Sequence, residues 1–181
     1  WVGYAEHDEQ RTVRPMAHAG HEAGYLEGLN TTWAEAERGR GANGTAIRTG
    51  RPCVIPNVAA DPCFAPWRAE AVERGYAALC ALPLIVGEQT LGALSIYASA
   101  EDAFDGDEVA LLSELAGDLA FGISVLRMRI ERDRTDRALQ ESEARYRLLF
   151  DSNPHAMWVL DAETRAFLTV NDAAVASYGF S

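Results

Sequence analysis

The chain has 181 residues and a formal net charge of −11 at pH 7, from 16 basic and 27 acidic side chains. An acidic chain is repelled by the phosphates of nucleic acids and by anionic membrane surfaces, so we expect no nucleic-acid partner and no basic membrane-binding module. A hydrophobic share of 48% with 24% charged residues is typical of globular proteins and excludes disordered and low-complexity classes. The length suits one domain of the usual ~100–150 residues and part of a second.

The two ends and the hydropathy pattern indicate a segment of a longer protein. The chain begins at Trp1 in a strand-like run without the features of a secretory signal, and it reaches Ser181 in a helix-like run. The most apolar stretch, 111–125, contains Glu114 and Asp118 and falls short of the ~20 apolar residues that span a bilayer. We therefore expect a cytoplasmic segment with no membrane span.

The cysteines and histidines predict no metal site. Cys53, Cys63 and Cys80 form no Cys-x-x-Cys pair, so free thiols in a reducing compartment are the simplest interpretation. His18 and His21 lie three residues apart, but no third ligand accompanies them, which favours surface or strand-edge histidines.

Short elements are predicted at the start of the chain. Two strand-like runs, 1–6 and 12–19, flank a polar turn and predict a hairpin. Apolar residues at helical spacing predict a helix over 24–38. A shorter helix at 45–48 is expected to end where Gly50 can adopt a left-handed conformation.

A strand and a further helix follow. Residues 53–58 predict a short strand in which Pro56 marks an edge or a bulge. Asp61 and Pro62 suit the start of a helix, and we expect this helix to end at Gly75.

The clearest β unit covers 79–86 and 91–98, joined by a turn at 87–90. Alternation in the first strand assigns one face to Cys80, Leu82, Leu84 and Val86. Alternation in the second strand assigns one face to Leu91, Ala93, Ser95 and Tyr97 and the other to Gly92, Leu94, Ile96 and Ala98. Both faces of the pair are largely apolar, which indicates a sheet that is covered on both sides.

A long helix is predicted from about 107 to 150. Asp105 and Glu108 have the spacing of a capping box, and no Pro or Gly occurs between Gly122 and Pro154. Apolar residues recur with the 4-3-4-3-4 spacing of a coiled coil at Leu112, Ala116, Leu119, Ile123, Leu126 and Ile130.

This helix has two interpretations. One is a solvated helix folded back on its own domain, and the first half, through Leu126, is expected to pack on the sheet. Beyond Leu126 the seam fades into the charged residues 127–137, so little apolar surface remains for folding back, which favours a parallel two-stranded stalk. We therefore expect a homodimer through residues 107–149, with a joint where the register of the seam breaks.

The end of the chain predicts the start of a second domain. After Pro154, strand candidates at 156–160 and 165–170 precede a helix that begins near Asn171. No Gly-x-Ser-x-Gly, His-Glu-x-x-His or Walker motif occurs in the chain, and its acidic residues lie in caps and helices rather than together. We expect no catalytic site in this segment.

The first part of the chain resembles a GAF domain. The matching motifs are Gly44-Thr45-Ala46-Ile47-Arg48-Thr49-Gly50-Arg51-Pro52, Asp61-Pro62-x-Phe64, Ala81-Leu82-Pro83-Leu84, Leu91-Gly92-Ala93-Leu94 and Phe104-x-x-Asp107-Glu108. They span most of residues 1–126, and the family's usual first helix is absent.

The tail resembles the beginning of a PAS domain. The matching segments are 143–154, Trp158-Val159-Leu160-Asp161 and Val170-Asn171-Asp172-Ala173-Ala174. The helix between the two parts resembles the signalling helices that join sensor modules in bacterial receptors.

These resemblances imply an α+β fold, with a six-stranded antiparallel sheet flanked by helices, a long C-terminal coiled-coil helix and a partial PAS domain. They also imply a pocket between one sheet face and residues 57–76, where GAF domains bind small molecules. The residues placed to line it are Trp67, Tyr76, Cys80, Ser95 and Tyr97. The alternative is that these residues are simply core, since aromatic side chains bury large areas with or without a ligand.

The sequence leaves the ligand and any cofactor unknown. Tyr97-Ala98-Ser99 stands where cyclic-nucleotide-binding GAF domains carry an Asn-Lys pair, and no cysteine has the neighbouring histidine of bilin-binding members. The cysteine motif of methionine sulfoxide reductases is not found. Cys63 lies near a helix N-terminus that favours a thiolate, so thiol reactivity stays open as an alternative.

The resulting hypothesis is a sensory relay segment of a cytoplasmic bacterial signalling protein. It consists of a GAF sensor at 1–126, a signalling-helix connector at 127–149 and the start of a PAS domain at 150–181. A bound small molecule would change the helix register and bias an output domain outside the chain, a histidine kinase or, as the alternative, a diguanylate cyclase. The competing hypotheses are a ligand-free dimerisation scaffold and, last, a redox enzyme that uses Cys63 or Cys80.

Overall fold

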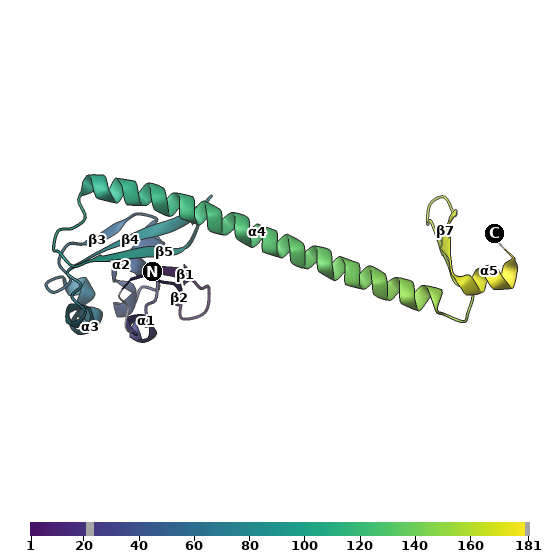
Figure 1. The fold of residues 1–181 in the computed structure, drawn as a ribbon, viewed down its shortest axis with the longest axis horizontal. Coiled ribbons are helices and arrows are strands. Elements are labelled where there is room, and N and C mark those ends of the chain that lie inside the picture. The colour runs from purple at the N-terminus through teal and green to yellow at the C-terminus, as the bar shows by residue number, and fades with distance from the viewer. Residues whose placement is uncertain (21–23, 180–181) are drawn as a thin grey trace. The chain divides into compact units, whose positions relative to one another are not determined.

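The computed structural model describes residues 1–20 and 24–179, which belong to two units, Trp1–Val125 and Leu126–Ser181. The first unit is built on a five-stranded antiparallel sheet with the strand order β2-β1-β5-β4-β3 (Figure 1). Its strands are β1 (Val2–Ala5), β2 (Val13–Ala17), β3 (Cys53–Ile55), β4 (Ala78–Val86) and β5 (Gln89–Ala98). The α+β fold is confirmed, although the described residues contain five strands in this sheet where six were expected.

The β4–β5 hairpin forms the centre of the sheet. It pairs from Ala78 opposite Ala98 to Val86 opposite Gln89. A bulge interrupts the register after Leu84, so Leu91 has no partner across the hairpin and packs with the residues under the long helix. The prediction that Leu91 shares a face with Ala93 was therefore wrong, because alternation does not continue through a bulge.

The helix predicted over 24–38 is also wrong. The structure has a single turn, α1 (Tyr25–Gly28), and a separate 3-10 turn at Glu37–Gly39. The backbone carbonyl of Leu29 accepts hydrogen bonds from Trp67 Nε1 at 2.7 Å and Arg38 Nη1 at 3.1 Å, and it does not continue a helical ladder. Side chains distant in sequence thus replace the hydrogen bond that a longer helix would have made.

The remaining short elements follow the sequence more closely. α2 (Ala42–Thr49) ends at Gly50, whose φ of 63° is left-handed as expected. The helix expected from Asp61 to Gly75 begins as a 3-10 segment, Pro62–Trp67, and continues as α3 (Arg68–Glu73). Pro66 explains this division, since its ring removes a backbone donor from the helical ladder.

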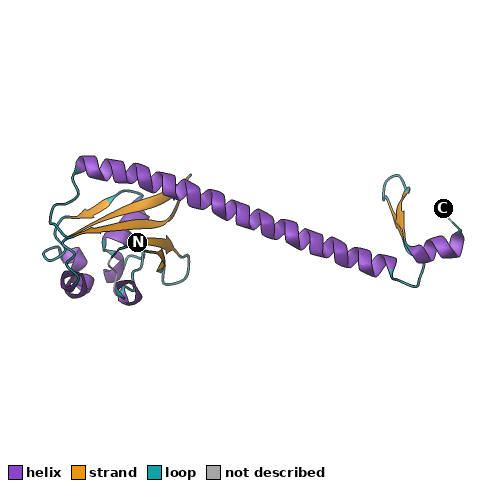
Figure 2. Cartoon of the chain, in the orientation of Figure 1, coloured by secondary structure: helices purple, strands orange, loops and turns teal. Residues whose placement is uncertain are grey.

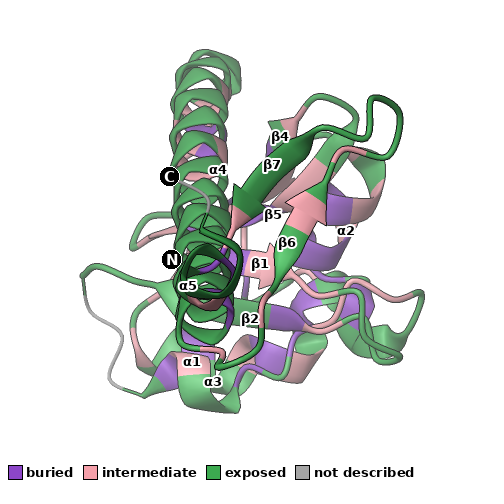
Figure 3. Ribbon diagram, turned by 90° about the vertical axis from the view of Figure 1, so that its right-hand side faces the viewer, coloured by how far each residue is buried: buried purple, intermediate pink, exposed green. Residues whose placement is uncertain are grey.

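Both faces of the sheet are covered, as the apolar alternation predicted (Figure 2). On one face Cys80, Leu82 and Leu84 pack with Ala116 and Ala120 of α4 (Gly106–Asp151). The opposite face is covered by the short helices and their loops, in a cluster of Tyr25, Leu29, Ala42, Ala46, Ile55, Val58, Phe64, Trp67, Ala71, Leu79 and Ala81. Figure 3 shows buried positions concentrated in the strands and the elements beside them, while most of α4 is exposed.

The predicted long helix is confirmed as α4, and the capping box at its start is formed. The backbone nitrogen of Glu108 donates to Asp105 Oδ1 at 2.9 Å, and that of Asp105 donates to Glu108 Oε2 at 3.0 Å. Ala116 is buried on the sheet and Ile123 packs there half-buried, whereas Leu126 is exposed. The sheet therefore occupies the first half of the predicted coiled-coil seam.

By length and composition alone, α4 is the one helix in the described ranges that is long and apolar enough to cross a membrane. Its apolar stretch contains Glu114 and Asp118 and places Ala116 and Ala120 against the sheet. The same apolar residues therefore have a role in the core of the first unit.

The second unit contains the end of α4 and a two-stranded sheet of β6 (Trp158–Leu160) and β7 (Phe167–Val170), followed by α5 (Asp172–Tyr178). Asn171, fully buried, holds these elements together. Its Oδ1 accepts from the backbone nitrogens of Met157 and Ala174, each at 2.9 Å. Its Nδ2 donates to three backbone carbonyls, those of Phe150, Asn153 and His155, at 3.0, 3.3 and 2.9 Å.

The packing of α4 on the sheet can be tested at its small residues. We expect Ala120→Leu to reduce the free energy of unfolding by about 1–3 kcal/mol, because the added atoms have no space against the sheet. Urea denaturation followed by circular dichroism measures this change. Ala110→Leu, at an exposed position of the same helix, is the matched control, and equal stability of the two variants would contradict the packing.

Candidate ligand site

The first unit contains a cavity of about 530 Å³ beside the end of β5. It is lined by Trp1, His18, Ala19, Gly20, Tyr25, Leu26, Arg74, Gly75, Tyr76, Leu94, Ser95, Ile96, Tyr97, Ala98 and Ser99. These residues come from the end of β5, the segments beside β1 and β2, the start of α1 and the turn after α3. Its volume lies in the range of about 300–1,000 Å³ that is typical of small-molecule sites.

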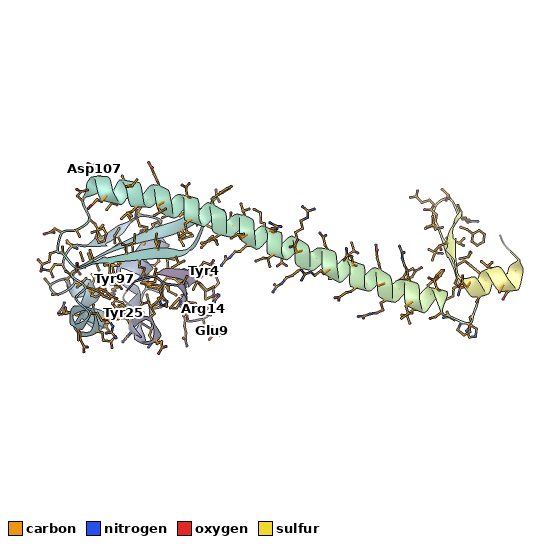
Figure 4. The ribbon with its side chains drawn as sticks, viewed as in Figure 1. Tyr4, Glu9, Arg14, Tyr25, Tyr97 and Asp107 are labelled. Carbon is orange, nitrogen blue, oxygen red and sulfur yellow. The ribbon has the colours of Figure 1, made fainter. Side chains whose placement is uncertain are left out.

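Three tyrosine rings form one wall of this cavity. Tyr76 and Tyr97 are stacked with their ring centroids 4.5 Å apart, and Tyr25 meets both rings edge-on, at 5.5 Å and 5.8 Å. Figure 4 shows Tyr25 and Tyr97 on the side of the sheet away from Asp107 at the start of α4. Tyr97 reaches this side by strand alternation, and a hydrogen bond of 3.0 Å from the Tyr76 backbone nitrogen to the Ala71 carbonyl holds the turn that carries Tyr76.

The hydroxyl groups of Tyr25 and Tyr97 are held neutral. Burial raises the pKa of Tyr25 to about 12, although a hydrogen bond with Tyr97 opposes the shift. Burial also raises the pKa of Tyr97 well above its usual value, and the neighbouring Tyr25 raises it further, while the donor on Trp1 opposes the shift. The two hydroxyl oxygens lie 3.4 Å apart, a long hydrogen bond that leaves both phenols able to contact a ligand.

Trp1 and Ser95 line the inner part of the cavity. The backbones of these two residues are paired, because each nitrogen donates to the other residue's carbonyl at 2.8 Å. The Ser95 hydroxyl donates to Asn43 Oδ1 of α2, and both side chains are buried. The indole nitrogen of Trp1 is buried and acts as a donor toward the Tyr97 hydroxyl, although without the geometry of a regular hydrogen bond.

Positive charge enters the cavity wall from Arg74. Its guanidinium carbon lies 5.3 Å from the ring centre of Tyr25, and Nη1 donates to the backbone carbonyl of Glu70 at 2.9 Å. His18 adds an exposed imidazole to the wall. No described residue that lines the cavity is an Asp or a Glu.

The structure brings together three of the residues selected from the sequence. Tyr76, Ser95 and Tyr97 line the cavity. Trp67 is buried in the core beside it and borders, with Tyr97, a void of about 10 Å³.

Cys80 lies on the opposite face of the sheet, against α4, so its placement in the pocket was wrong. In the hairpin Cys80 pairs with Ile96, and paired residues share a face, which separates it from Ser95 and Tyr97. Sequence reasoning also missed Tyr25, Trp1 and Arg74 as cavity residues. Tyr25 and Arg74 belong to short elements whose positions depend on contacts distant in sequence.

Burial works against thiolate formation at two of the three cysteines. Burial raises the pKa of the Cys80 thiol to about 11 and also raises that of Cys53. A thiol with a raised pKa is protonated at neutral pH, which disfavours Cys80 as a nucleophile. Cys63 is exposed, and its backbone nitrogen donates to the Asp61 carboxylate at 2.7 Å.

The described residues contain no group of three or more His, Cys, Asp or Glu side chains that could hold a metal ion. Of the histidine pair considered in the sequence, His18 lines the cavity, whereas His21 lies outside the described residues.

Family comparisons agree with this architecture. Residues 1–124 match the model of the GAF domain, and residues 144–181 match that of the PAS domain. The chain belongs to the GAF domain family. GAF and PAS domains are sensory modules, so this chain is a sensor segment of the signalling type.

Individual proteins resemble this chain in sequence or in fold. A methyl sulfide methyltransferase-associated sensor of Methanosarcina acetivorans is 28% identical over 139 residues, which are 76% of this chain and 13% of that protein. A domain assigned to a two-component sensor histidine kinase of Sinorhizobium meliloti has a TM-score of 0.51 at 23% identity, covering 74% of this chain and 81% of that one. A GAF domain/HD domain protein of Geobacter sulfurreducens has a TM-score of 0.54 at 18% identity, covering 70% and 80%.

The neutral state of Tyr25 has a consequence at alkaline pH. The folded protein holds the phenol proton up to a pKa of about 12, whereas the unfolded chain releases it near the usual value of about 10. The free energy of unfolding therefore falls as pH rises from about 10 to about 12, by about 2 kcal/mol for this residue. In the Tyr25→Phe variant we expect the free energy of unfolding to fall less over this pH range, because the phenol is absent. Urea denaturation at a series of pH values measures the difference.

The chain suits this measurement because all 16 of its basic side chains are arginine, so no lysine titrates in the same range. Tyr146→Phe, at an exposed ring in the second unit, controls for the loss of one hydroxyl. If the free energy of unfolding falls equally steeply with pH in wild type and in Tyr25→Phe, Tyr25 does not hold its proton as a buried phenol.

Proposed function

We propose that this chain senses a small molecule in the cavity beside β5 and relays its presence through α4 in a dimer. In this proposal residues 1–126 are the sensor, 127–149 are the connector and 150–181 begin a PAS domain. Ligand contacts come from Tyr76, Ser95 and Tyr97, with Trp67 supporting the ring of Tyr97 from the core. The family membership and the cavity support this function.

The observation that carries the proposal is the double role of β5. Residues 94–98 of β5 line the cavity, and two of them, Leu94 and Ile96, also pack in the cluster under α4. A ligand that prefers one position of Tyr97 acts on a strand whose other face is the packing surface of the helix. A difference in ligand affinity between two packings of that strand is enough to shift the population of helix positions.

The dimer is proposed to form through the outward face of α4 in the first unit. The sheet covers the inner face as far as Ile123, but the outer face exposes Leu111, Leu115 and Val125 at 66, 54 and 41%. With Asp118 and Gly122 between them, these positions follow a four-three-four-three spacing, which is the pattern of a two-stranded contact. A ligand-free dimerisation scaffold would use the same face, and ligand binding distinguishes the two functions.

We propose that the output domain belongs to a part of the protein outside this chain. The relative from Methanosarcina acetivorans is a sensor that extends far beyond the matched part. We propose a cytoplasmic signalling protein whose output is a histidine kinase, with a diguanylate cyclase as the alternative. No catalytic site is assigned to the present chain.

Filling the cavity tests the sensor function. Ser99→Trp places a large ring at a lining position, and we expect it to weaken binding of cavity ligands at least tenfold. Thermal shifts against a panel of small metabolites identify ligands of the wild-type chain, and calorimetry measures their affinities. Ala100→Trp, at an exposed neighbour that does not line the cavity, is the control. A wild type that binds no metabolite would favour the ligand-free scaffold.

Charge on the outward face of α4 tests the dimer. We expect wild type to be a dimer in light scattering coupled to size exclusion, and Leu115→Arg to be a monomer, because the contact would desolvate the guanidinium in both copies. Val72→Arg changes an exposed apolar residue on α3 and should leave the dimer intact. A wild-type monomer, or a dimer that survives Leu115→Arg, would remove this face as the interface.

A further inference from the structure

Three hydrogen-bonding groups of the cavity wall form a short chain. The indole nitrogen of Trp1 acts as a donor toward the hydroxyl of Tyr97, and the hydroxyl oxygens of Tyr97 and Tyr25 lie 3.4 Å apart. An indole can donate a hydrogen bond but never accept one, whereas a phenol can do both. The chain therefore begins at Trp1 and runs through Tyr97 to Tyr25.

This chain has one donor hydrogen more than it has contacts within the described residues. Trp1, Tyr97 and Tyr25 each bring one hydrogen, but only the two contacts above join them. If Tyr97 donates to Tyr25, the hydroxyl hydrogen of Tyr25 is left over. If Tyr25 donates to Tyr97, the hydroxyl hydrogen of Tyr97 is left over. Both residues line the cavity, so in either case one phenol can donate to a group inside it.

Charges of both signs act on this wall. The guanidinium carbon of Arg74 lies 5.3 Å from the ring centre of Tyr25, and its Nη1 donates to the Glu70 carbonyl at 2.9 Å. The charge of Glu70 raises the pKa of Tyr25, whereas that of Arg74 lowers it. These opposed charges give the wall little selectivity for an ion, and a charged ligand would lose its hydration on entry.

The rest of the wall is largely aromatic and aliphatic. Tyr76 and Tyr97 are stacked with their ring centroids 4.5 Å apart, and a further ring can extend the stack or meet it edge-on. Leu26, Leu94 and Ile96 add aliphatic side chains to the lining. A flat aromatic ligand therefore finds contacts on its faces and its edges.

We infer that the cavity selects a neutral, flat aromatic molecule that carries a hydrogen-bond acceptor, such as a carbonyl oxygen or a ring nitrogen. Its ring packs on Tyr76 and Tyr97, and its acceptor binds the hydroxyl hydrogen that is left over at Tyr25 or Tyr97. This inference rests on the proposed sensor function. A cavity of about 530 Å³ has room for a ligand of one or two rings.

NMR titration of the full chain, which measures weak affinities, tests this class. Acetophenone is the reference probe, because it is neutral and aromatic and carries an acceptor. Ethylbenzene lacks the acceptor, cyclohexyl methyl ketone lacks the aromatic ring, and benzoate and benzylamine carry charges of opposite sign. A net hydrogen bond changes affinity by roughly two- to tenfold. We expect acetophenone to bind at least threefold more tightly than ethylbenzene and the saturated ketone, and at least tenfold more tightly than either ion.

Tyrosine variants assign the donor. The double variant Tyr25→Phe/Tyr97→Phe keeps both rings and removes both hydroxyls, so we expect the preference for acetophenone over ethylbenzene to fall below twofold. Each single variant retains one hydroxyl and should keep the preference. The control variant Tyr4→Phe/Tyr146→Phe removes two hydroxyls at positions that do not line the cavity, and it should bind both probes as wild type does.

The outcomes separate this inference from the function on which it rests. Benzoate or benzylamine binding as tightly as acetophenone overturns the neutral class, and equal binding of ethylbenzene or the saturated ketone overturns the acceptor or the aromatic ring. A double variant that keeps the preference overturns the tyrosines as donors. In each of these cases the sensor function stands if Ser99→Trp weakens the binding tenfold.

Failure of all five probes to bind overturns the inference as well. The sensor function falls with it only if the wider metabolite panel also finds no ligand that Ser99→Trp affects.

Discussion

The first unit depends on one constraint, which is that the β4–β5 hairpin must be covered on both faces. Its alternating residues are apolar on each side, and each side exposed to water would cost hydrophobic free energy along nine or ten residues of strand. α4 covers the face of Cys80, Leu82 and Leu84. Short helices and loops cover the other face, and they leave the cavity beside Tyr97. The cavity and the long helix are therefore two sides of the same strands.

In the short helices and loops that cover the second face, the loop layer, many backbone groups are hydrogen-bonded by side chains. Its turns have few backbone partners of their own, so side chains replace them. Arg48 donates to the carbonyls of Trp33, Ala34 and Gly39, at 3.0, 3.1 and 2.6 Å, and Trp67 donates to that of Leu29. The position of Tyr25 in the cavity wall follows from these contacts, since Tyr25 lies in the same layer.

Local patterns were sufficient to predict the elements that local interactions stabilise. The capping box at Asp105, the uninterrupted α4 and the shared face of Ser95 and Tyr97 all follow from spacing within a few residues.

The errors arose where groups distant in sequence determine the local structure. The Leu29 carbonyl is bonded by a tryptophan 38 residues away, which ended the expected helix, and the bulge at Leu91 depends on how two strands pair. Cys80 was misplaced because its face is fixed by its partner Ile96, which the single strand does not reveal.

The order of the strands leaves β2 and β3 at the two edges of the sheet. Pro15 lies within β2, and Pro52 and Pro56 flank β3. A proline has no backbone donor, and edge prolines prevent a neighbouring chain from adding a strand. Both edges are thus poor templates for main-chain pairing between molecules, which protects the sheet from growing by aggregation. In the proposed dimer, association is left to side-chain surfaces, and there the choice of partner depends on sequence rather than on backbone alone.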